Sequence, residues 1–386
     1  MNKAYLFLAY GAIFALSLLD NGRGPAYPSI LKDFHLETSK GALIFSLASF
    51  SGLILNFTSR YWLGFLGPIK ATRYSLALLG MSGILYWYSG QSHQFPLLIL
   101  ASVLLGVGLA ICTITMNILV ASGSNEKNRR KLFAGLHSVY GATSFAAPFI
   151  LTFFISNSLT WKEYFLVVSL AAFVVLFISF FLNGLKKIKI NKSPLKKSVP
   201  LSERFFFGVM LASYVSAEIL ISSRLPYVLE KAYQFTPNQA AFSISCFFAF
   251  LGLGRLSFSF INLRYSSGSI LVFSLITSLT SFLLGFLISP YFYVLIGLFQ
   301  SYFFPVAMNY ISEIYQDRSE YMTTAVMTFI GVGLSFTHYI FGISNEILGT
   351  KISFVLVFFL FTLSLSLLLK INRQLARVSS KSSESL

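Results

Sequence analysis

The sequence predicts an all-α integral membrane protein with twelve transmembrane helices in two six-helix halves. Of its 386 residues, 55% are hydrophobic and only 11% are charged, with a mean hydropathy of +0.73. Soluble domains are typically about a quarter charged. Apolar runs of about 20 residues, each long enough to cross about 30 Å of hydrocarbon, recur along the whole chain. These observations place the chain in a bilayer.

Twelve apolar runs follow one another, most of them separated by short polar connections. Each can form a helix that crosses the bilayer at about 1.5 Å per residue. The predicted spans are residues 5–31, 39–59, 70–90, 96–121, 132–156, 162–184, 205–229, 238–260, 268–288, 291–314, 321–343 and 349–370.

Positive charge is concentrated in alternate connections. The chain has 29 Lys and Arg residues against 13 Asp and Glu, a net charge of +16. With a cytoplasmic amino terminus, most of the cations, Arg255 and Arg264 among them, fall in cytoplasmic segments, as the positive-inside rule requires. The charge therefore indicates topology and not a nucleic-acid partner. It predicts a multi-pass protein of the cytoplasmic membrane with both termini cytoplasmic.

The longest polar interruption, LKKIKINKSPLKKSVPLSE at residues 185–203, divides the chain. The predicted organisation is a first six-helix bundle (1–184), a basic cytoplasmic linker (185–203), a second bundle (204–372) and a cytoplasmic tail (373–386). Membrane lipid is an expected partner, since lysines beside the inner leaflet are attracted to anionic headgroups. We expect no appended soluble domain.

The two halves align at a constant offset of 198 residues. Asp20 then meets Glu218, and Pro28 meets Pro226. Repeats of this kind in transporters place the binding site near the bilayer midplane, where the repeats meet. The repeat therefore puts one acid at an equivalent place in each half.

Asp20 and Glu218 are the candidates for proton coupling. A charged side chain within a span costs at least about 2.5–3.5 kcal/mol, so it is expected to face a wet cavity or a partner. Burial raises the pKa of a carboxyl group and a nearby cation lowers it, so such a group can exchange a proton as a cavity opens and closes. A permanent ion pair between Asp20 and Arg23, at i and i+3, is the alternative. Glu218 has no cation at i+3 or i+4.

Arg23 and Arg224 follow these acids on the same helices and are candidates for holding an anionic or polyhydroxylated substrate. For Arg224 the alternative is a side chain that extends to the outer headgroups. Pro25 and Pro28 are expected to loosen the first helix beside Arg23, since helix breaks are tolerated where backbone lines a cavity.

Other polar side chains within spans are candidate substrate ligands. Amides suit hydroxyl-rich ligands because they carry both donors and acceptors. Hydrogen bonds between helices are the alternative explanation. The candidates are Asn117, His137, Tyr140, Gln300 and Asn309, whereas His338 is expected to be structural.

Several function classes find no support in the sequence. It contains no nucleotide-binding loop, catalytic triad or metal-ligand cluster, and Cys112 and Cys246 both lie within spans. We therefore expect no enzyme, metal or cofactor, with a proton gradient as the driving force.

Twelve spans joined at the middle by a basic loop resemble the major facilitator superfamily. YVSAEILISSRLPYVL, residues 214–229, is similar to the seventh helix of its fucose and glucose permease-like proton symporters, with Glu218 on that pattern's acid. The segment from Asn117 through RRKLFAGLHSVYGATSFAAP resembles their fourth and fifth helices, and implies that His137 faces the cavity. FFP at 303–305 resembles their tenth helix.

The departures from this pattern concern the substrate. Arg224 stands where those carriers usually have Trp, which weakens the case for a neutral sugar and favours an acidic one. Their second acid, on helix four, has no counterpart in ICTITMN. The superfamily's inner-loop signature survives only as Arg60, Gly64, Lys70 and Arg73, without its Asp.

Together, these features predict a monomeric secondary transporter that takes up a small sugar or sugar-like acid with protons by alternating access. A proton-driven exporter of lipophilic compounds is the alternative, and 42 Phe residues are compatible with its aromatic cavity. A transporter-like sensor that binds without moving solute is a third possibility.

Overall fold

A computed structural model describes residues 1–186, 188, 199–260 and 265–384. The first half consists of α1 (Lys3–Asp33), α2 (Thr38–Phe57), α3 (Ser59–Ser92), α4 (Phe95–Gly123), α5 (Glu126–Ser156) and α6 (Trp161–Phe181). The second half consists of α7 (Leu201–Tyr233), α8 (Pro237–Phe260), α9 (Ser267–Leu287), η1 (Pro290–Val294), α10 (Leu295–Gln300), α11 (Phe303–Tyr315), η2 (Gln316–Arg318), α12 (Ser319–Leu348), α13 (Thr350–Ser353) and α14 (Leu356–Glu384).

These elements confirm the predicted twelve-helix architecture. Within the described ranges, eleven segments are long and apolar enough to cross a membrane; η1, α10 and α11 together form one of them, and α13 with the start of α14 forms another. The twelfth is α3, a 34-residue helix that is kinked where Gly67 adopts a φ of 70° before Pro68. A positive φ strains a residue with a Cβ, so glycine suits this kink.

Each half has its own hydrophobic core, as a two-bundle protein requires. One core is built from side chains between Tyr5 and Val175, and the other from side chains between Val199 and Ile371. The exception is Tyr227, which belongs to α7 but packs into the core of the first half. The halves therefore interlock at the end of α7.

The halves meet through three helix pairs: α1 with α7, α2 with α12, and α5 with α8. We call the end of the molecule at which α1 and α7 finish the distal end. The Thr38 hydroxyl donates to the Gly342 carbonyl oxygen at 3.0 Å, and the Asn345 amide donates to the Thr38 hydroxyl at 3.0 Å. The backbone N–H of Ser39 donates to a Glu346 carboxylate oxygen at 2.6 Å.

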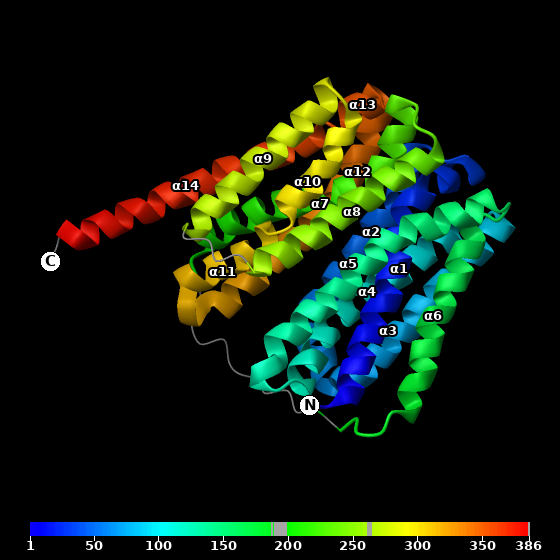
Figure 1. Ribbon diagram of the computed structural model, residues 1–386, viewed down its shortest axis with the longest axis horizontal. Helices are drawn as coiled ribbons and strands as arrows, with labels where there is room; N and C mark the ends of the chain where they lie inside the picture. Colours follow the sequence, from blue (N-terminus) through cyan, green and yellow to red (C-terminus); the bar gives the residue numbers. More distant parts are fainter. Residues whose placement is uncertain (187, 189–198, 261–264, 385–386) are drawn as a thin grey trace.

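These hydrogen bonds join the halves at the distal end. Toward the other end, which holds the amino terminus, the helices of the two halves diverge (Figure 1). The structure therefore shows a conformation in which the halves are closed against each other on one side of the predicted membrane.

The predicted linker, 185–203, falls mostly outside the described residues. The predicted tail, 373–386, begins inside α14, which continues to Glu384. Near this end of the molecule, Asn309 on α11 donates to Ser267 and Glu313 at 3.2 and 2.6 Å, so its partners belong to the packing of α11 against α9.

Candidate functional site

Asp20 and Arg23 lie one turn apart on α1 and form an ion pair through Arg23 Nη2 and Asp20 Oδ1. Arg23 is 8% exposed, and its guanidinium carbon also lies 5.0 Å from the centroid of the Phe45 ring. The structure thus forms the i, i+3 pair that the sequence left open.

The helix that carries this pair is not loosened as expected. α1 runs unbroken from Lys3 to Asp33 with Pro25 and Pro28 inside it. A Cβ on Gly24 would lie 3.1 Å from the carbonyl oxygens of Ser222 and Ser223, so this glycine lets α1 lie directly against α7. This tight packing supports α1 where the prolines remove its own hydrogen bonds.

Glu218 on α7 has a cationic partner on a neighbouring helix. Arg255 Nη2 lies 3.5 Å from Glu218 Oε1, and Arg255 Nε donates to the Ser301 carbonyl oxygen at 3.2 Å. The side chains of Glu218 and Arg255 are 12% and 31% exposed.

The sequence analysis counted Arg255 with the cytoplasmic segments, although the predicted span 238–260 contains it. The structure places Arg255 on α8, five residues before the end of this helix at Phe260. What the sequence analysis did not identify is its pairing with Glu218. The signal that could have found it is an arginine inside the apolar run AFLGLGRLSF.

Tyr140 on α5 is near enough to both acids for their charges to act on its hydroxyl. Asp20 from its own half and both Glu218 and Arg255 from the other half act on its hydroxyl electrostatically, and the Asn21 side chain lies beside it. Asn21 in turn donates to the Ser144 hydroxyl at 2.9 Å. Tyr140 is therefore influenced by the ion pair of each half.

Close contact between α5 and α8 makes this link possible. A Cβ on Gly141, the residue after Tyr140, would lie 3.7 Å from the Cα of Gly252. Such a short separation brings side chains on α5 within reach of the second half. His137, one turn before Tyr140, is exposed and is influenced by the charge of Arg255.

Arg224 crosses from the second half into the first. Its guanidinium carbon lies 3.9 Å from the centroid of the Tyr27 ring and 4.0 Å from that of Phe45, and Phe341 of its own half is 5.8 Å away. The side chain is 0% exposed. This burial is incompatible, in this conformation, with the alternative that Arg224 extends to the headgroups.

Two further predicted ligands, Gln300 and Asn117, differ in their burial and in their hydrogen bonds. Gln300 is fully buried, and its side-chain amide has no hydrogen-bond partner among the described residues. Tyr214, one turn before Glu218, donates to the Gln300 backbone carbonyl at 2.9 Å and so ties α10 to α7. Asn117 is exposed and donates to the Thr113 carbonyl of its own helix at 2.7 Å.

His338 was expected to be structural, and the structure places it beside the arginines. Its ring lies 5.1 Å from that of Phe45, and both Arg23 and Arg224 influence it electrostatically. In the part of the chain that the structure describes, no three His, Cys, Asp or Glu side chains come close enough together to hold a metal ion.

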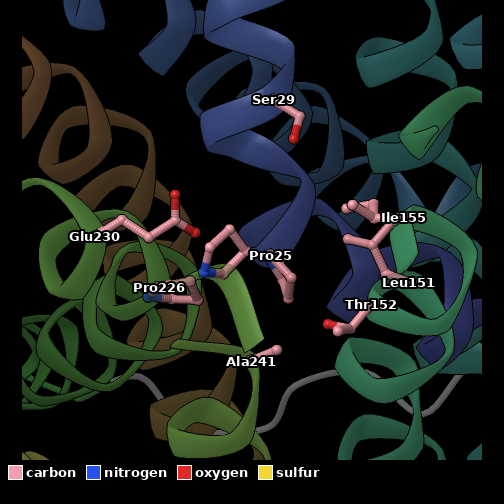
Figure 2. A pocket seen from close by; sticks show the side chains of 9 residues that line it. Pro25, Ser29, Leu151, Thr152, Ile155, Pro226, Glu230 and Ala241 are labelled. Atoms are coloured by element: carbon pink, nitrogen blue, oxygen red, sulfur yellow. The ribbon is translucent and has the colours of Figure 1, made fainter. Parts of the chain in front are cut away.

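A small pocket lies between the halves toward the distal end (Figure 2). Its walls come from α1, α5, α7 and α8, and its volume is about 60 Å³. A cavity needs about 10–15 Å³ of such volume to hold one water molecule, so the pocket is large enough for ordered water. Its lining residues are Pro25, Ser29, Leu151, Thr152, Ile155, Pro226, Glu230, Pro237 and Ala241.

Comparison with known proteins agrees with this architecture. A sequence model of the Major Facilitator Superfamily matches residues 9–217 and 205–385, which together span both halves. No curated protein matches the sequence significantly.

Two solved structures share the fold. One is a Major Facilitator Superfamily transporter, FucP, in the outward conformation, with a TM-score of 0.66 and 13% identity over 95% of this chain and 98% of that chain. The other is a variant of the E. coli fucose:proton symporter FucP, with a TM-score of 0.63 and 13% identity over 94% and 97% of the two chains. With twelve helices in two bundles and a family match along nearly its whole length, this chain belongs to the major facilitator superfamily of membrane transporters and is not an enzyme.

Proposed function

We propose that this protein is a proton-coupled symporter that takes up a small sugar or sugar-like acid across the cytoplasmic membrane by alternating access. The observation that carries the proposal is the pair of membrane-embedded acids, Asp20 and Glu218. Each half contributes one, each is bound to an arginine, and both act on Tyr140. The protein would work as a monomer, with both termini in the cytoplasm.

The two ion pairs suit reversible protonation. A carboxylate bound to an arginine is stabilised in its charged form, and protonation releases the arginine. At 3.5 Å the Glu218–Arg255 pair is long and its arginine is partly exposed, so little has to be rearranged when this carboxylate takes up a proton. Protonation of either acid changes the electrostatic environment of the Tyr140 hydroxyl. Tyr140 on the first half can therefore respond to the protonation state of Glu218 on the second half.

The substrate would bind where these polar side chains converge. Arg23 and Arg224 would orient it, and the amides and hydroxyls of Asn117, His137, Tyr140 and Gln300 would contact its hydroxyl groups. Asn309 stays a predicted ligand, although its present partners on α9 and α11 favour a packing role.

Uptake into proteoliposomes tests the coupling. Labelled monosaccharides and sugar acids are offered with and without an imposed pH gradient, and a pH dye reports on the lumen. We expect the lumen to acidify as substrate enters, and we expect a Glu218→Gln protein to lose accumulation against a gradient. Uptake that ignores the pH gradient contradicts proton coupling, and full accumulation by Glu218→Gln contradicts the role of this residue.

Glu163→Gln is the matched control. Glu163 lies in the first turn of α6, where its carboxylate caps the helix with Thr160. Glutamine serves equally well at this position of a capping box. The control therefore removes a carboxylate from the first half and is expected to leave accumulation unchanged.

A further inference from the structure

Arg224 is the least compensated charge in the membrane-embedded part of the structure. None of its three guanidinium nitrogens has a hydrogen-bond partner among the described residues. It is completely buried, so water cannot replace those partners. An unsatisfied buried donor is costly, and more so when it is charged. The rings of Tyr27 and Phe45 return part of this cost, because a desolvated cation is attracted to aromatic faces.

The charges around Arg224 do not cancel. Arg23 is bound to Asp20 and Arg255 is bound to Glu218, and these are the two salt bridges within the described residues. Arg224 has no carboxylate at salt-bridge distance in that same part of the chain. Among Asp20, Arg23, Glu218, Arg255 and Arg224, one positive charge is therefore in excess.

The groups around Arg224 do not include an ion-pair partner. His338 packs on Phe45 beside both Arg23 and Arg224, and its Nδ1 has no partner among the residues described. The phenol groups of Tyr27 and Tyr227 act favourably on Arg224 but are uncharged at neutral pH. The acid beyond them, Glu346, acts on Tyr27 and accepts the hydrogen bond from Ser39 at the distal end.

We propose that the substrate is a monoanion whose carboxylate binds the guanidinium of Arg224 when the halves separate at the distal end. This inference rests on the alternating access proposed above. Arg224 belongs to α7, while the two rings nearest to it, Tyr27 and Phe45, belong to the first half. Separation of the halves withdraws the rings and leaves a desolvated, donor-rich cation facing the gap. A carboxylate offers the matching bidentate geometry.

The same arrangement explains how the empty protein could close. Without a substrate, closing the distal end would bury a bare cation, which is very costly. The faces of Tyr27 and Phe45 take the place of the anion in the empty protein. The rings and the anion therefore compete for Arg224, and weakening the rings should strengthen anion binding.

Binding to the purified protein tests this competition. The probes are three matched pairs: glucuronate and glucose, galacturonate and galactose, and gluconate and sorbitol. We expect at least one acid to bind at least about tenfold more tightly than its neutral partner, and Arg224→Gln to weaken that acid by about thirtyfold or more. Arg224→Lys, which keeps the charge but loses the fork of donors, should fall between.

A second variant keeps Arg224 in place and guards against misfolding of Arg224→Gln. Phe45→Leu removes one ring while retaining an apolar side chain, and we expect it to bind the same acid about 3- to 10-fold more tightly than the wild type. The control is Arg204→Gln, because Arg204 on α7 also lies over a ring, Tyr321, but both residues belong to the second half. We expect Arg204→Gln to leave the affinity for the acid unchanged.

Four results would overturn the inference: a neutral sugar that binds as well as its acid, acid binding undiminished in Arg224→Gln, unchanged or weaker acid binding in Phe45→Leu, or no acid bound at all. Failure of the proposed proton coupling is distinguishable from these. An acid that binds through Arg224 but enters vesicles regardless of pH leaves the anion site intact. A neutral sugar taken up with protons leaves the coupling intact and refutes the anion site.

Discussion

Replacing Gly342 with alanine should wedge the halves apart at the distal end. A Cβ at this position of α12 would lie 2.8 Å from the Cβ of Ala42, 2.8 Å from the carbonyl oxygen of Thr38 and 2.9 Å from the Cα of Ser39. All three atoms belong to the first half, and none is the end of a flexible side chain. The methyl group can therefore be accommodated only if α12 moves away from α2.

The size of the effect follows from these contacts. Overpacking a tight interface costs about 1–3 kcal/mol. Displacing the Gly342 carbonyl also weakens its 3.0 Å hydrogen bond from Thr38, at a net cost of about 0.5–1.5 kcal/mol. The gain in helix propensity from glycine to alanine applies equally to the closed and open states. Together these costs come to about 1.5–4.5 kcal/mol, so the ratio of closed to open molecules should fall by about 10- to 1,600-fold, at 1.4 kcal/mol per tenfold change.

Distance measurements between two spin labels provide the assay. Leu159 and Ile288 are both exposed and lie in the α5–α6 and α9–η1 connections of the two halves. Cysteines at these positions, in a background without Cys112 and Cys246, report on separation at the distal end. We expect Gly342→Ala to add or enlarge a population with longer distances.

Gly252→Ala is the matched control on α8. A Cβ there would have Gly141 Cα, at 4.0 Å, as its nearest neighbour, which is an ordinary contact. The label distances should stay as in the wild type. Our interpretation of the distal contact is refuted if Gly342→Ala also keeps the wild-type distances, or if both alanines lengthen them equally.

Three further changes probe the cross-half contacts and the ion pair. Glu346→Gln should raise the population with longer label distances by about 2- to 5-fold. The reason is that an exposed charged cap on the Ser39 N–H contributes about 0.3–1 kcal/mol. An unchanged population would show that this cap does not hold the halves together. Tyr140→Phe should lose uphill uptake but retain exchange of substrate across vesicles, and wild-type uphill uptake would remove Tyr140 from the coupling. Arg255→Gln should lower the melting temperature more than the double variant with Glu218→Gln, because it leaves a carboxylate unpaired; equal melting temperatures would mean that the pair is not coupled.

The fold was predictable because the bilayer restricts it. A span must be apolar over about 20 residues, so hydropathy locates it within a few positions. The predicted span 205–229 lies within α7, Leu201–Tyr233, and 96–121 lies within α4, Phe95–Gly123. The spans were less informative about irregularities, since the break between Gln300 and Phe303 lies inside a run, Pro290–Tyr315, whose average hydropathy is that of a single span.

The partners of the charged residues were only partly predictable. The Asp20–Arg23 pair could be anticipated because i and i+3 are adjacent on any helix. The Glu218–Arg255 pair depends on how α7 packs against α8, and no spacing along one helix reveals it. The two rings nearest to Arg224, Tyr27 and Phe45, come from the opposite half, so their positions depend on the conformation as well as on the fold.

Each ion pair lies within one half, and this restricts how protonation can drive the opening and closing of the halves. Asp20 and Arg23 share α1, and Glu218 and Arg255 both belong to the second half, so separating the halves breaks neither pair. Near these charges, Tyr140 feels the charges of Glu218 and Arg255 across the halves, and Arg224 contacts the rings of the first half. Under the proposed coupling, protonation of Glu218 therefore has to act on closure through Tyr140, while the substrate acts through Arg224. The Tyr140→Phe and Arg224→Gln variants should accordingly fail in different ways, the first in coupling and the second in binding.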